Sequence, residues 1–528
     1  METPINPLLR QIHIGLGPNG YEPVASSMTA NSTTYIREFE QLTANLVRIC
    51  PGHIWPGESY KSICPRPILI NQGHQAHLKR LHEALTKAIT DIVQRWWSDT
   101  EANFPSRMPL AKEEEDLLLW IEDQVSQGRM RPFSACRGSW RPDFLIKDNL
   151  TATPNGIIND QAGESELFCI TEINARFSFN GCLHEALGQE ALNDMGMDKL
   201  GLASATNSAQ MLDGLMSLFR QGLPLHLLKD AEHGFDIHMF MDIMQRRFGV
   251  TTRPITPADL RLVPDPENET GFKLCCLASH KNGSNQDTGS HPAQVGSTVH
   301  QAGKKTVTWI NDAGEWVEEI HQVGLELHQR EIVALDAEML RQVSLRCFND
   351  MRTVLLVHDK RMLGMVKQEL ENLVNRGVLT LAEAQVLAKG IADTANPGSP
   401  EMGEVLKLTK ANPELRKQYL LKPVRSGKGA GIVFGDETSP DEWVAALENL
   451  QSPVLVPGVS CVVQRRITPR LYDVIIKSSG DRVRYPLVGT YHAIHGNLLG
   501  LGIWRTSADR ICALSTGGSW MCSVISRG

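Results

Sequence analysis

The spacing of apolar positions divides the chain into a helical first part, a mixed middle and a strand-rich end. Apolar residues recur at three- and four-residue intervals from Gly73 to about Asp99 and from Ala111 to Gln127, which predicts two amphipathic helices. The residues before Gly73 are rich in Pro, Gly, Ser and Thr, so we expect a loosely structured arm there. The same periodicity predicts further helices over residues 183–221, 235–248 and 353–395.

Alternating patterns predict strands in the middle and at the end of the chain. Arg141–Lys147 and Leu167–Asn174 are expected to form two strands joined by a polar connection over 151–165. Residues 260–328 predict a small α/β segment, interrupted at 281–305 by a mobile surface insertion with almost no apolar residues. Further strands are expected over 419–423, 431–435, 462–464, 472–477 and 485–489. The fold class is therefore α+β or α/β with several mixed sheets.

Composition narrows the classes of function. The chain has 528 residues, 41% hydrophobic and 21% charged, which is typical of a globular protein of roughly two to four structural units. Its net charge of -7 gives no general electrostatic reason to bind nucleic acid or a membrane surface. No apolar run approaches the roughly 20 residues of a membrane span, and the first residues lack the features of a secretory signal. The 11 cysteines form no CxxC pair, which favours reduced thiols, so we expect a cytoplasmic enzyme.

An acidic group lies on the two strands of the middle region. Because side chains alternate along a strand, Glu172, Asn174 and Arg176 share one face, and Arg141 and Asp143 share a face of the preceding strand. If the strands form a hairpin, two carboxylates and an amide oxygen come together, which is a ligand set suited to Mg²⁺. The alternative is a surface strand whose acids pair with the two arginines.

A glycine-rich segment follows the strand that ends near Lys422. Ser426, Gly427, Gly429 and Gly431 lie in this segment, where backbone N–H groups could surround phosphate oxygens. The lysine precedes the glycines and no helix follows, so the segment is not a Walker A loop. A glycine-rich hairpin turn without a ligand is the alternative.

Late basic residues form a third candidate group. Gln464 and Arg466 follow an apolar strand, and Arg505 follows a Gly-Leu-Gly stretch. An arginine at such a strand end could stabilise the charge that develops on a terminal phosphate. Read singly, an arginine such as Arg505 is more often solvated or salt-bridged than bound to a phosphate.

Taken in this order, the motifs resemble a circularly permuted ATP-grasp ligase of the glutathionylspermidine synthetase-like group. The R-x-D and E-x-N-x-R-F motifs, at Arg141–Asp143 and Glu172–Phe177, resemble the metal-binding motif of that group, which in the permuted order comes first. The resemblance implies metal binding by Asp143, Glu172 and Asn174. Within 358–363 it makes Lys360 the first nucleotide lysine, with Lys407 and Lys410 as competitors.

The resemblance also implies roles for the later motifs. Lys422 would be the second nucleotide lysine, and Ser426, Gly427, Gly429 and Gly431 would cover the phosphates. Gln464 and Arg466 fall where the adenine-contacting hinge is expected, and Arg505 falls where an arginine meets the γ-phosphate. The implied catalytic residues are Arg505, Arg141 and Arg176, the last as a grip for a carboxylate substrate.

The implied fold is α+β: two lobes sandwiching ATP in circularly permuted order, with an α/β pre-ATP-grasp-like domain and a helical amino-terminal region. The expected parts are 1–130, an arm and helical region that could cap the substrate; 131–205, the metal-binding strands and a helix; 206–350, the substrate domain; and 351–528, the nucleotide-binding lobe and carboxy-terminal strands.

The implied activity is that of an ADP-forming carboxylate–amine ligase. ATP and two Mg²⁺ ions are the expected cofactors, a small amino-acid-like carboxylate and an amine are the expected substrates, and amide formation through an acyl phosphate is the expected reaction. A homodimer is the base-rate expectation for its assembly. A small-molecule kinase on the same fold and a non-catalytic nucleotide-binding protein are the alternatives.

Overall fold

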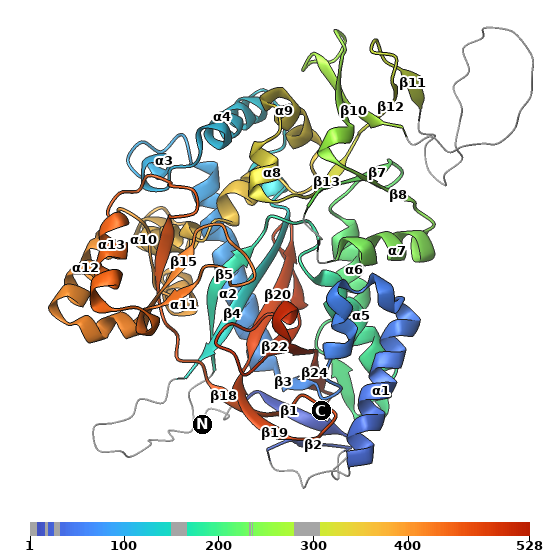
Figure 1. Cartoon of the computed structure of the whole chain (residues 1–528), viewed down its shortest axis with the longest axis vertical. Coiled ribbons are helices and arrows are strands. Elements are labelled where there is room, and N and C mark those ends of the chain that lie inside the picture. The colour runs from blue at the N-terminus through green and yellow to red at the C-terminus, as the bar shows by residue number, and fades with distance from the viewer. Residues whose placement is uncertain are drawn as a thin grey trace, which may run out of the picture.

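The largest sheet combines strands from the middle and the end of the chain. The computed structural model describes residues 8–15, 20–25, 32–148, 166–231, 234, 236–278 and 307–527. The sheet has the order β23-β22-β20-β4-β5, with β21 paired to β20 and all neighbours antiparallel. Its strands are β4 (Ser139–Lys147), β5 (Leu167–Asn174), β20 (Val488–Ile494), β21 (Asn497–Leu501), β22 (Trp504–Thr506) and β23 (Ser519–Met521). The teal β4 and β5 therefore lie beside the red β20 and β22 at the centre of the molecule (Figure 1).

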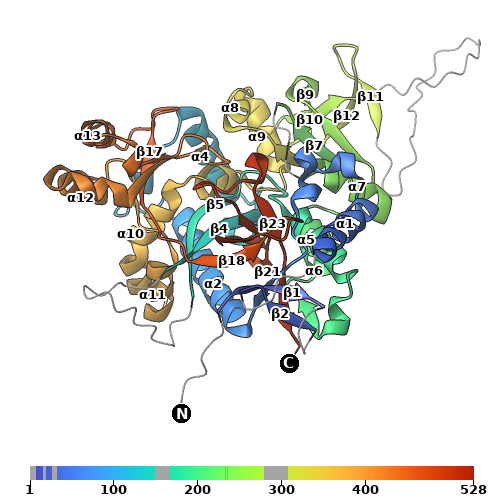
Figure 2. The same ribbon diagram turned by 60° about the horizontal axis from the view of Figure 1, so that its bottom comes forward.

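The amino-terminal arm belongs to a second sheet, so the expectation of a loosely structured arm is wrong. This sheet has the order β2-β1-β3-β24-β6. Its strands are β1 (Arg10–Ile14), β2 (Tyr21–Pro23), β3 (Ile68–Ile70), β6 (Leu202–Ser204) and β24 (Ser523–Ser526). Helix α1 (Ser32–Ile49) packs against α5 (Cys182–Asn193), which is followed by α6 (Ser208–Met216). The helices expected over 183–221 are confirmed as α5 and α6, and β6 lies between them. In Figure 2, β1 and β2 lie close to the C-terminus.

The strands of the arm were not predicted because the strand that completes their sheet, β24, is remote in the sequence, and because some of their buried residues are polar. β1 has only two apolar residues, Ile12 and Ile14, and it buries the polar Gln11 and His13 as well, so its apolar pattern is too short to predict a strand. The Gln11 carboxamide is satisfied by backbone groups from elsewhere in the chain: it donates to Arg66 O and accepts from the N–H of Ile475 at 2.7 Å. Such contacts have no signature in the local sequence.

A buried hydrogen-bond chain fastens this arm to α5. Ser59 Oγ lies 2.8 Å from His184 Nε2, and His184 Nδ1 lies 2.9 Å from Asp236 Oδ1. The second oxygen of Asp236 accepts the N–H of Leu183 at the first turn of α5. Ser59 is only 5% exposed, and its carbonyl accepts the indole N–H of Trp520. The order of groups is that of a serine-hydrolase triad, but the buried hydroxyl serves to tie the elements together.

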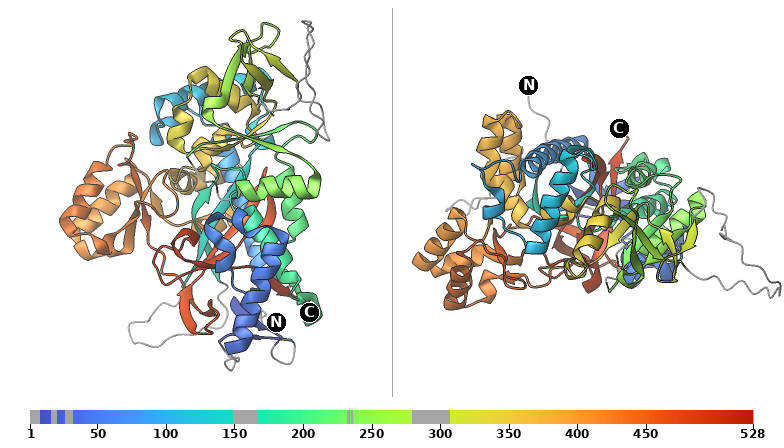
Figure 3. Two further views of the ribbon diagram at one scale, coloured as in Figure 1. Left: turned by 45° about the vertical axis from the view of Figure 1, so that its right-hand side comes forward. Right: turned by 90° about the horizontal axis from the view of Figure 1, so that it is seen from above.

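The four-stranded sheet β14-β17-β15-β16 and its helices form a separate lobe, drawn in orange (Figure 1). Its elements are β14 (Thr394–Ala395), α12 (Pro400–Ala411), β15 (Tyr419–Pro423), β16 (Val433–Phe434), α13 (Pro440–Asn449) and β17 (Cys461–Arg465). Met402, Trp443 and Leu447 from the two helices pack with Leu421 and Val463 of the sheet. Strands β15, β16 and β17 were predicted, whereas β14 lies at the end of the region expected to be helical, 353–395, and α12 and α13 were not predicted. Figure 3 shows the lobe projecting from one side of the molecule.

Residues 225–326 contain two further sheets. The parallel sheet β13-β7-β8 consists of β7 (Leu225–Lys229), β8 (Thr252–Ile255) and β13 (Val323–Glu326), with α7 (Ile237–Phe248) between β7 and β8. The antiparallel sheet β11-β12-β10-β9 consists of β9 (Leu260–Pro264), β10 (Phe272–Leu277), β11 (Thr308–Ile310) and β12 (Trp316–Glu319). The described part of 260–328 is therefore all strand and turn, not α/β. The predicted insertion at 281–305 lies outside the described residues.

Helices complete the core beneath the central sheet. They are α2 (Gln72–Gln94), α3 (Phe104–Arg107), α4 (Lys112–Ser126), α8 (Gln329–Val333), α9 (Ala337–Arg346), α10 (Arg361–Asn375) and α11 (Leu381–Gly390). The predicted helices over 111–127 and 235–248 are confirmed as α4 and α7, and the one over 73–99 as α2, which ends earlier, at Gln94. The region expected to be helical over 353–395 contains α10 and α11, preceded by a π-turn and followed by β14. Helix α2 begins at Gln72 because the Asn71 side chain accepts the N–H of His74, while the His74 ring accepts the N–H of Asn71.

Shorter elements connect the rest of the chain. A hairpin of β18 (Leu471–Ile475) and β19 (Arg482–Pro486) follows the orange lobe. Single turns of helix occur at Gly52–Ile54, Pro56–Ser62, Phe133–Ala135, Met197–Leu200, Pro257–Asp259, Pro413–Gln418, Gly435–Glu437 and Leu514–Thr516, and a π-turn at Thr353–Val357. Among the helices that the structure describes, none has the length and apolar character needed to span a bilayer. The cysteines, all within the described part, are free thiols.

Candidate active site

The predicted hairpin is confirmed, and it places the acidic side chains opposite each other. In the β4–β5 register Asp143 faces Glu172, and Arg141 faces Asn174. The Asn174 amide donates to Glu172 Oε1 at 3.4 Å. The two carboxylates and the amide therefore meet on adjacent strands of the central sheet.

A β-bulge at Thr171 joins this hairpin to the orange lobe. The register passes from the Asp143–Glu172 pair to Phe144–Ile170, which leaves Thr171 out of the ladder. Its carbonyl instead accepts the Lys422 ammonium at 3.2 Å and the Gln464 carboxamide at 3.1 Å. The extra residue thus turns a backbone carbonyl toward the neighbouring sheet, where both donors lie.

Asp143 is held by two arginines. Its Oδ1 accepts Arg141 Nε at 3.0 Å, and its Oδ2 accepts Arg505 Nη2 at 2.6 Å. Arg141 also donates to the carbonyl of Asn180 at 3.2 Å. Asn180 has a left-handed backbone (φ 51°), which places this carbonyl at the turn before α5. The alternative of a surface strand is wrong, because Asp143 is buried. Its expected pair with Arg141 is present, but its second partner is Arg505 from the end of the chain.

Glu172 lies within a cluster of positive charge. Its Oε2 is 3.8 Å from Lys360 Nζ, and about a quarter of its side chain is exposed. Burial alone would raise the pKa of Glu172, but Lys360 and Lys422, followed by Arg141 and Arg505, lower it to about 2. Acidic groups from the middle of the sequence and basic groups from its end thus converge at one place.

The two lysines come from different elements of the fold. Lys422, on β15, is buried, and burial lowers its pKa, as does the charge of Lys360, whereas Glu172 acts in the opposite sense. Lys360 precedes α10; its backbone N–H donates to Val424 O at 3.1 Å, and its ammonium donates to the carbonyl of Ser426. Both ammonium groups therefore donate to backbone carbonyls, Lys360 to Ser426 and Lys422 to Thr171.

The position of Lys360 is fixed by a buried ionic network. Asp359 pairs with Arg361 at 2.8 Å and with Arg425 at 3.1 Å, and Arg425 also pairs with Glu114 of α4. Burial would raise the pKa of Asp359, but the two arginines lower it to about 2. Sequence reasoning did not assign Asp359 or Arg425. The sequence signal for Asp359 was the run of four polar residues, His358–Arg361, directly after the apolar stretch Val354–Val357.

The glycine-rich segment forms an open turn beside Lys360. Gly429 and Gly431 have φ of 77° and 76°, which L side chains rarely adopt. A Cβ on Gly429 would lie 2.3 Å from Ile511, so the turn packs closely on the loop before β23. Gly427 has open space around it, and Ser426 contributes its carbonyl to Lys360.

Of the two residues predicted at the hinge, only Gln464 joins the cluster. It is buried, and besides the Thr171 carbonyl its amide contacts Thr394 Oγ1 at 3.1 Å. Arg466 instead pairs with Asp436 at 3.1 Å and lies over the Phe434 ring. Its side chain is about one-third exposed and takes no part in the contacts around the acids.

Arg176 lies immediately after the acidic strand, next to a histidine that sequence reasoning did not assign. Its guanidinium stacks on the Phe177 ring, 4.5 Å from the centroid. His358 Nδ1 accepts the N–H of Ala175 at 3.3 Å. Burial, then the charges of Arg176 and Lys360, lower the pKa of His358 to about 3, so the imidazole is neutral.

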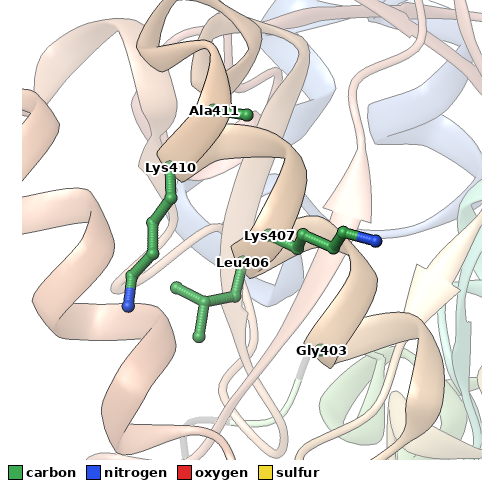
Figure 4. Close-up of a pocket in the computed structure, with 5 residues that line it drawn as sticks. All are labelled: Gly403, Leu406, Lys407, Lys410 and Ala411. Atoms are coloured by element: carbon green, nitrogen blue, oxygen red, sulfur yellow. The ribbon is translucent and has the colours of Figure 1, made fainter.

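Lys407 and Lys410, the competitors for the first-lysine role, lie elsewhere. Both are exposed on α12, where they line a surface depression of about 540 Å³ together with Gly403, Leu406 and Ala411. Their side chains project to opposite sides of the helix (Figure 4). Lys410 pairs with Glu448 of α13 at 2.7 Å. Lys360, not these residues, lies beside the acids.

The chemistry of this cluster suits a magnesium–nucleotide complex. Carboxylate and amide oxygens on adjacent strands are the hard donors that Mg²⁺ uses. Four cations surround two carboxylates, which leaves two uncompensated positive charges for a polyanion. A triphosphate therefore fits the site electrostatically.

The site combines acids on the central sheet, Lys422 on the neighbouring lobe, Lys360 before α10 and a glycine-rich turn beside Lys360. This combination is compatible with an ATP-grasp enzyme. The sequence profile of the AnkG N-terminal domain family matches residues 81–356, and the chain is 33% identical to the ATP-grasp enzyme ankG of Aspergillus thermomutatus over 525 residues, 98% of this chain and all of that protein. The chain therefore belongs to the AnkG family of ATP-grasp enzymes.

The comparisons confirm the predicted family at this level, and the chain is an ATP-dependent ligase in the general sense of its class. Among solved structures, a glutathione synthetase-like effector from Globodera pallida, solved in its apo form, aligns with a TM-score of 0.48. The two chains are 10% identical, and the alignment covers 94% of this chain and 97% of the other.

Proposed function

We propose that the protein is an ADP-forming carboxylate–amine ligase that acts on small amino-acid-like molecules through an acyl phosphate. The observation that supports this proposal is the convergence of Glu172 and Asp143 on one sheet with Lys422 and Lys360 from outside it. Carboxylate activation by ATP brings two anions together, so it needs a site with surplus positive charge and metal ligands.

Each group has a definite task in this reaction. Asp143, Glu172 and Asn174 would hold Mg²⁺, which supplies neutralising charge for the triphosphate when bound. Lys360 and Lys422 would exchange their carbonyl partners for phosphate oxygens. That exchange is favourable because an ammonium binds an anionic oxygen more strongly than a neutral carbonyl.

The arginines would act on the transferring group. A carboxylate oxygen of the acid substrate attacks the γ-phosphorus, and ADP leaves with the electrons of the broken P–O bond. The amine then attacks the acyl carbon, phosphate leaves, and the amine loses a proton. Arg505 and Arg141, which hold Asp143 in the free protein, would stabilise the phosphoryl oxygens. The glycine-rich turn would shield the acyl phosphate from water.

The circularly permuted order and the four-part domain division are part of the same proposal. The acidic hairpin precedes both lysines in the sequence, yet it shares a sheet with β20, β22 and β23 from the end of the chain. This arrangement supports a lobe assembled from the two distant segments. We extend the proposal to action in the cytoplasm on small molecules, with neither nucleic acid nor membrane as partner.

Hydroxylamine trapping tests the proposal. Purified protein is incubated with Mg²⁺–ATP, hydroxylamine and each of the twenty amino acids, and ADP and hydroxamate are measured. We expect both products with at least one acid, and their loss in Asp143→Asn and Glu172→Gln. Glu315→Gln, which removes an acid from the distant β11–β12 turn, is the control and should behave as wild type. A stable phosphoester in place of a hydroxamate would indicate the kinase, and nucleotide binding without turnover would indicate the non-catalytic alternative.

A further inference from the structure

Only one of the two ring nitrogens of His358 has a hydrogen-bond partner among the described residues. The residue follows the π-turn Thr353–Val357 and is 7% exposed. Its Nδ1 accepts the N–H of Ala175, so Nδ1 carries no proton. In a neutral imidazole the hydrogen must then lie on Nε2.

The Nε2–H donor has no hydrogen-bond partner among the residues that the structure describes, and the atom is buried. A buried donor without an acceptor destabilises a protein, so such atoms in native structures call for an explanation. A ligand that supplies the missing acceptor is one explanation, and the surroundings show what kind of ligand fits.

The charged groups that face His358 favour an anion. Arg176 and Lys360 contribute positive charge, and Glu172 and Asp359 contribute negative charge. Asp359 is already paired with two arginines, and Glu172 is paired with Lys360. Arg176 immediately follows Ala175, the residue that fixes the imidazole. A guanidinium and a neutral N–H donor therefore lie together at the edge of the acidic cluster.

We propose that Arg176 and His358 form the subsite that binds the carboxylate of the acid substrate. This inference rests on the proposed ligase activity, because a carboxylate here would lie beside the place where Lys360 and Glu172 hold the triphosphate and its metal. Arg176 provides the charge, and Nε2–H of His358 provides a directed donor that selects the orientation of the attacking oxygen. The atom is shielded from solvent, so segment 358–360 must shift when Lys360 exchanges the Ser426 carbonyl for a phosphate.

Two isosteric substitutions separate this role from a structural one. In His358→Gln the amide nitrogen takes the place of Nε2 and keeps the donor, but the acceptor for Ala175 is lost. In His358→Asn the amide oxygen takes the place of Nδ1 and keeps the bond to Ala175, but the Nε2 donor is lost. A carboxylate subsite requires the donor, whereas a purely structural histidine requires the acceptor.

The measurement is calorimetric binding of single amino acids to protein saturated with Mg²⁺ and a non-hydrolysable ATP analogue. For the amino acid that binds wild type most tightly, we expect His358→Asn to weaken binding about 10- to 100-fold and His358→Gln to stay within about 5-fold. Arg176→Lys should weaken it about 10-fold or more, since the ammonium cannot bind a carboxylate in a bidentate manner. The affinity for the ATP analogue alone should change less than about 3-fold in all three variants, because none of these side chains is assigned to the nucleotide.

Each outcome decides a separate question. The reverse order, with His358→Asn close to wild type and His358→Gln impaired, overturns the subsite even if hydroxamate forms. Failure of every amino acid to bind the nucleotide-loaded protein also overturns it. If amino acids bind with the expected order but no hydroxamate is ever trapped, the subsite stands and the ligase proposal fails.

Discussion

Replacing Glu172 with Gln removes the charge that balances the cationic cluster. The pKa of Glu172 is about 2, against an ordinary value of 4.5, because the surrounding lysines and arginines outweigh the effect of burial. At about 1.4 kcal/mol for each tenfold change in the ionisation constant, folding favours the ionised carboxylate by about 3 kcal/mol. Gln has the shape of the protonated acid, so Glu172→Gln should lower the free energy of unfolding by about 3 kcal/mol at pH 7.

The pH dependence of this loss follows from the direction of the shift. A carboxylate whose pKa is lower in the folded state stabilises the protein above its unfolded pKa, near 4.5, and the contribution disappears as the pH falls toward 2. Urea unfolding of wild type and Glu172→Gln, followed by tryptophan fluorescence between pH 7 and pH 2.5, should therefore show a gap that is constant down to about pH 5 and then narrows.

Glu315→Gln is the matched control for this measurement. Contacts with Arg261 and Asn311 also lower the pKa of Glu315 to about 2, but this carboxylate lies at a surface turn, where solvent screens the interaction. Its removal should leave ADP release unchanged and shift the unfolding curve far less. The reasoning is refuted if Glu172→Gln unfolds at the wild-type urea concentration at pH 7, because the four cations would then not depend on this acid.

Three further results are expected. Lys360→Met should weaken ATP binding, measured by calorimetry, about 100-fold. Lys407→Met, on the exposed face of α12, should change the affinity less than about 2-fold. Equal effects of the two substitutions would contradict the assignment of Lys360 as the first nucleotide lysine. Arg505→Lys should lower kcat for ADP release by about 10²–10³ with little change in the KM for ATP; an unchanged kcat excludes Arg505 from the reaction. Burial raises the pKa of Glu185 to about 8, so at pH 7 folding requires this carboxyl group to take up a proton. Glu185→Gln should therefore stabilise the protein by about 3 kcal/mol at pH 7, and by nothing near pH 4, where the carboxyl group is largely protonated in the unfolded chain as well. Urea unfolding measures both values, and destabilisation at pH 7 would contradict the raised pKa.

The parts of the fold that were predictable from the sequence are those whose pattern is local. Helix α4 carries its apolar residues at helical spacing, and β4 and β5 show alternation bounded by polar segments, so these bounds were placed within a few residues. The pairing of β3 with β24 joins residues more than 450 positions apart, and no local pattern carries that information. The short strands of the arm are stabilised by that pairing, which is why the arm showed no strand signal of its own.

The candidate site divides in the same way. Acids, lysines and glycines are visible as residue types in an order, so their grouping was predictable from the sequence. The contribution of Thr171 was not, because it depends on a backbone carbonyl and on a register shift, not on the side chain. His358 has a visible side chain, but its significance comes from a hydrogen bond to the backbone of Ala175, more than 180 residues earlier.

The bulge at Thr171 suggests how nucleotide binding and lobe position are linked. Its carbonyl receives one bond from Lys422 and one from Gln464, both on the orange lobe. If Lys422 turns to a phosphate, the lobes lose a bond to a neutral carbonyl and gain a bridge through the nucleotide, while Gln464 keeps the register between them. An ammonium–phosphate bond is the stronger of the two, so the exchange favours closure only when nucleotide is present. The lysine that joins the lobe to the central sheet through the Thr171 carbonyl would then join them through the nucleotide, because both bonds use the same ammonium group.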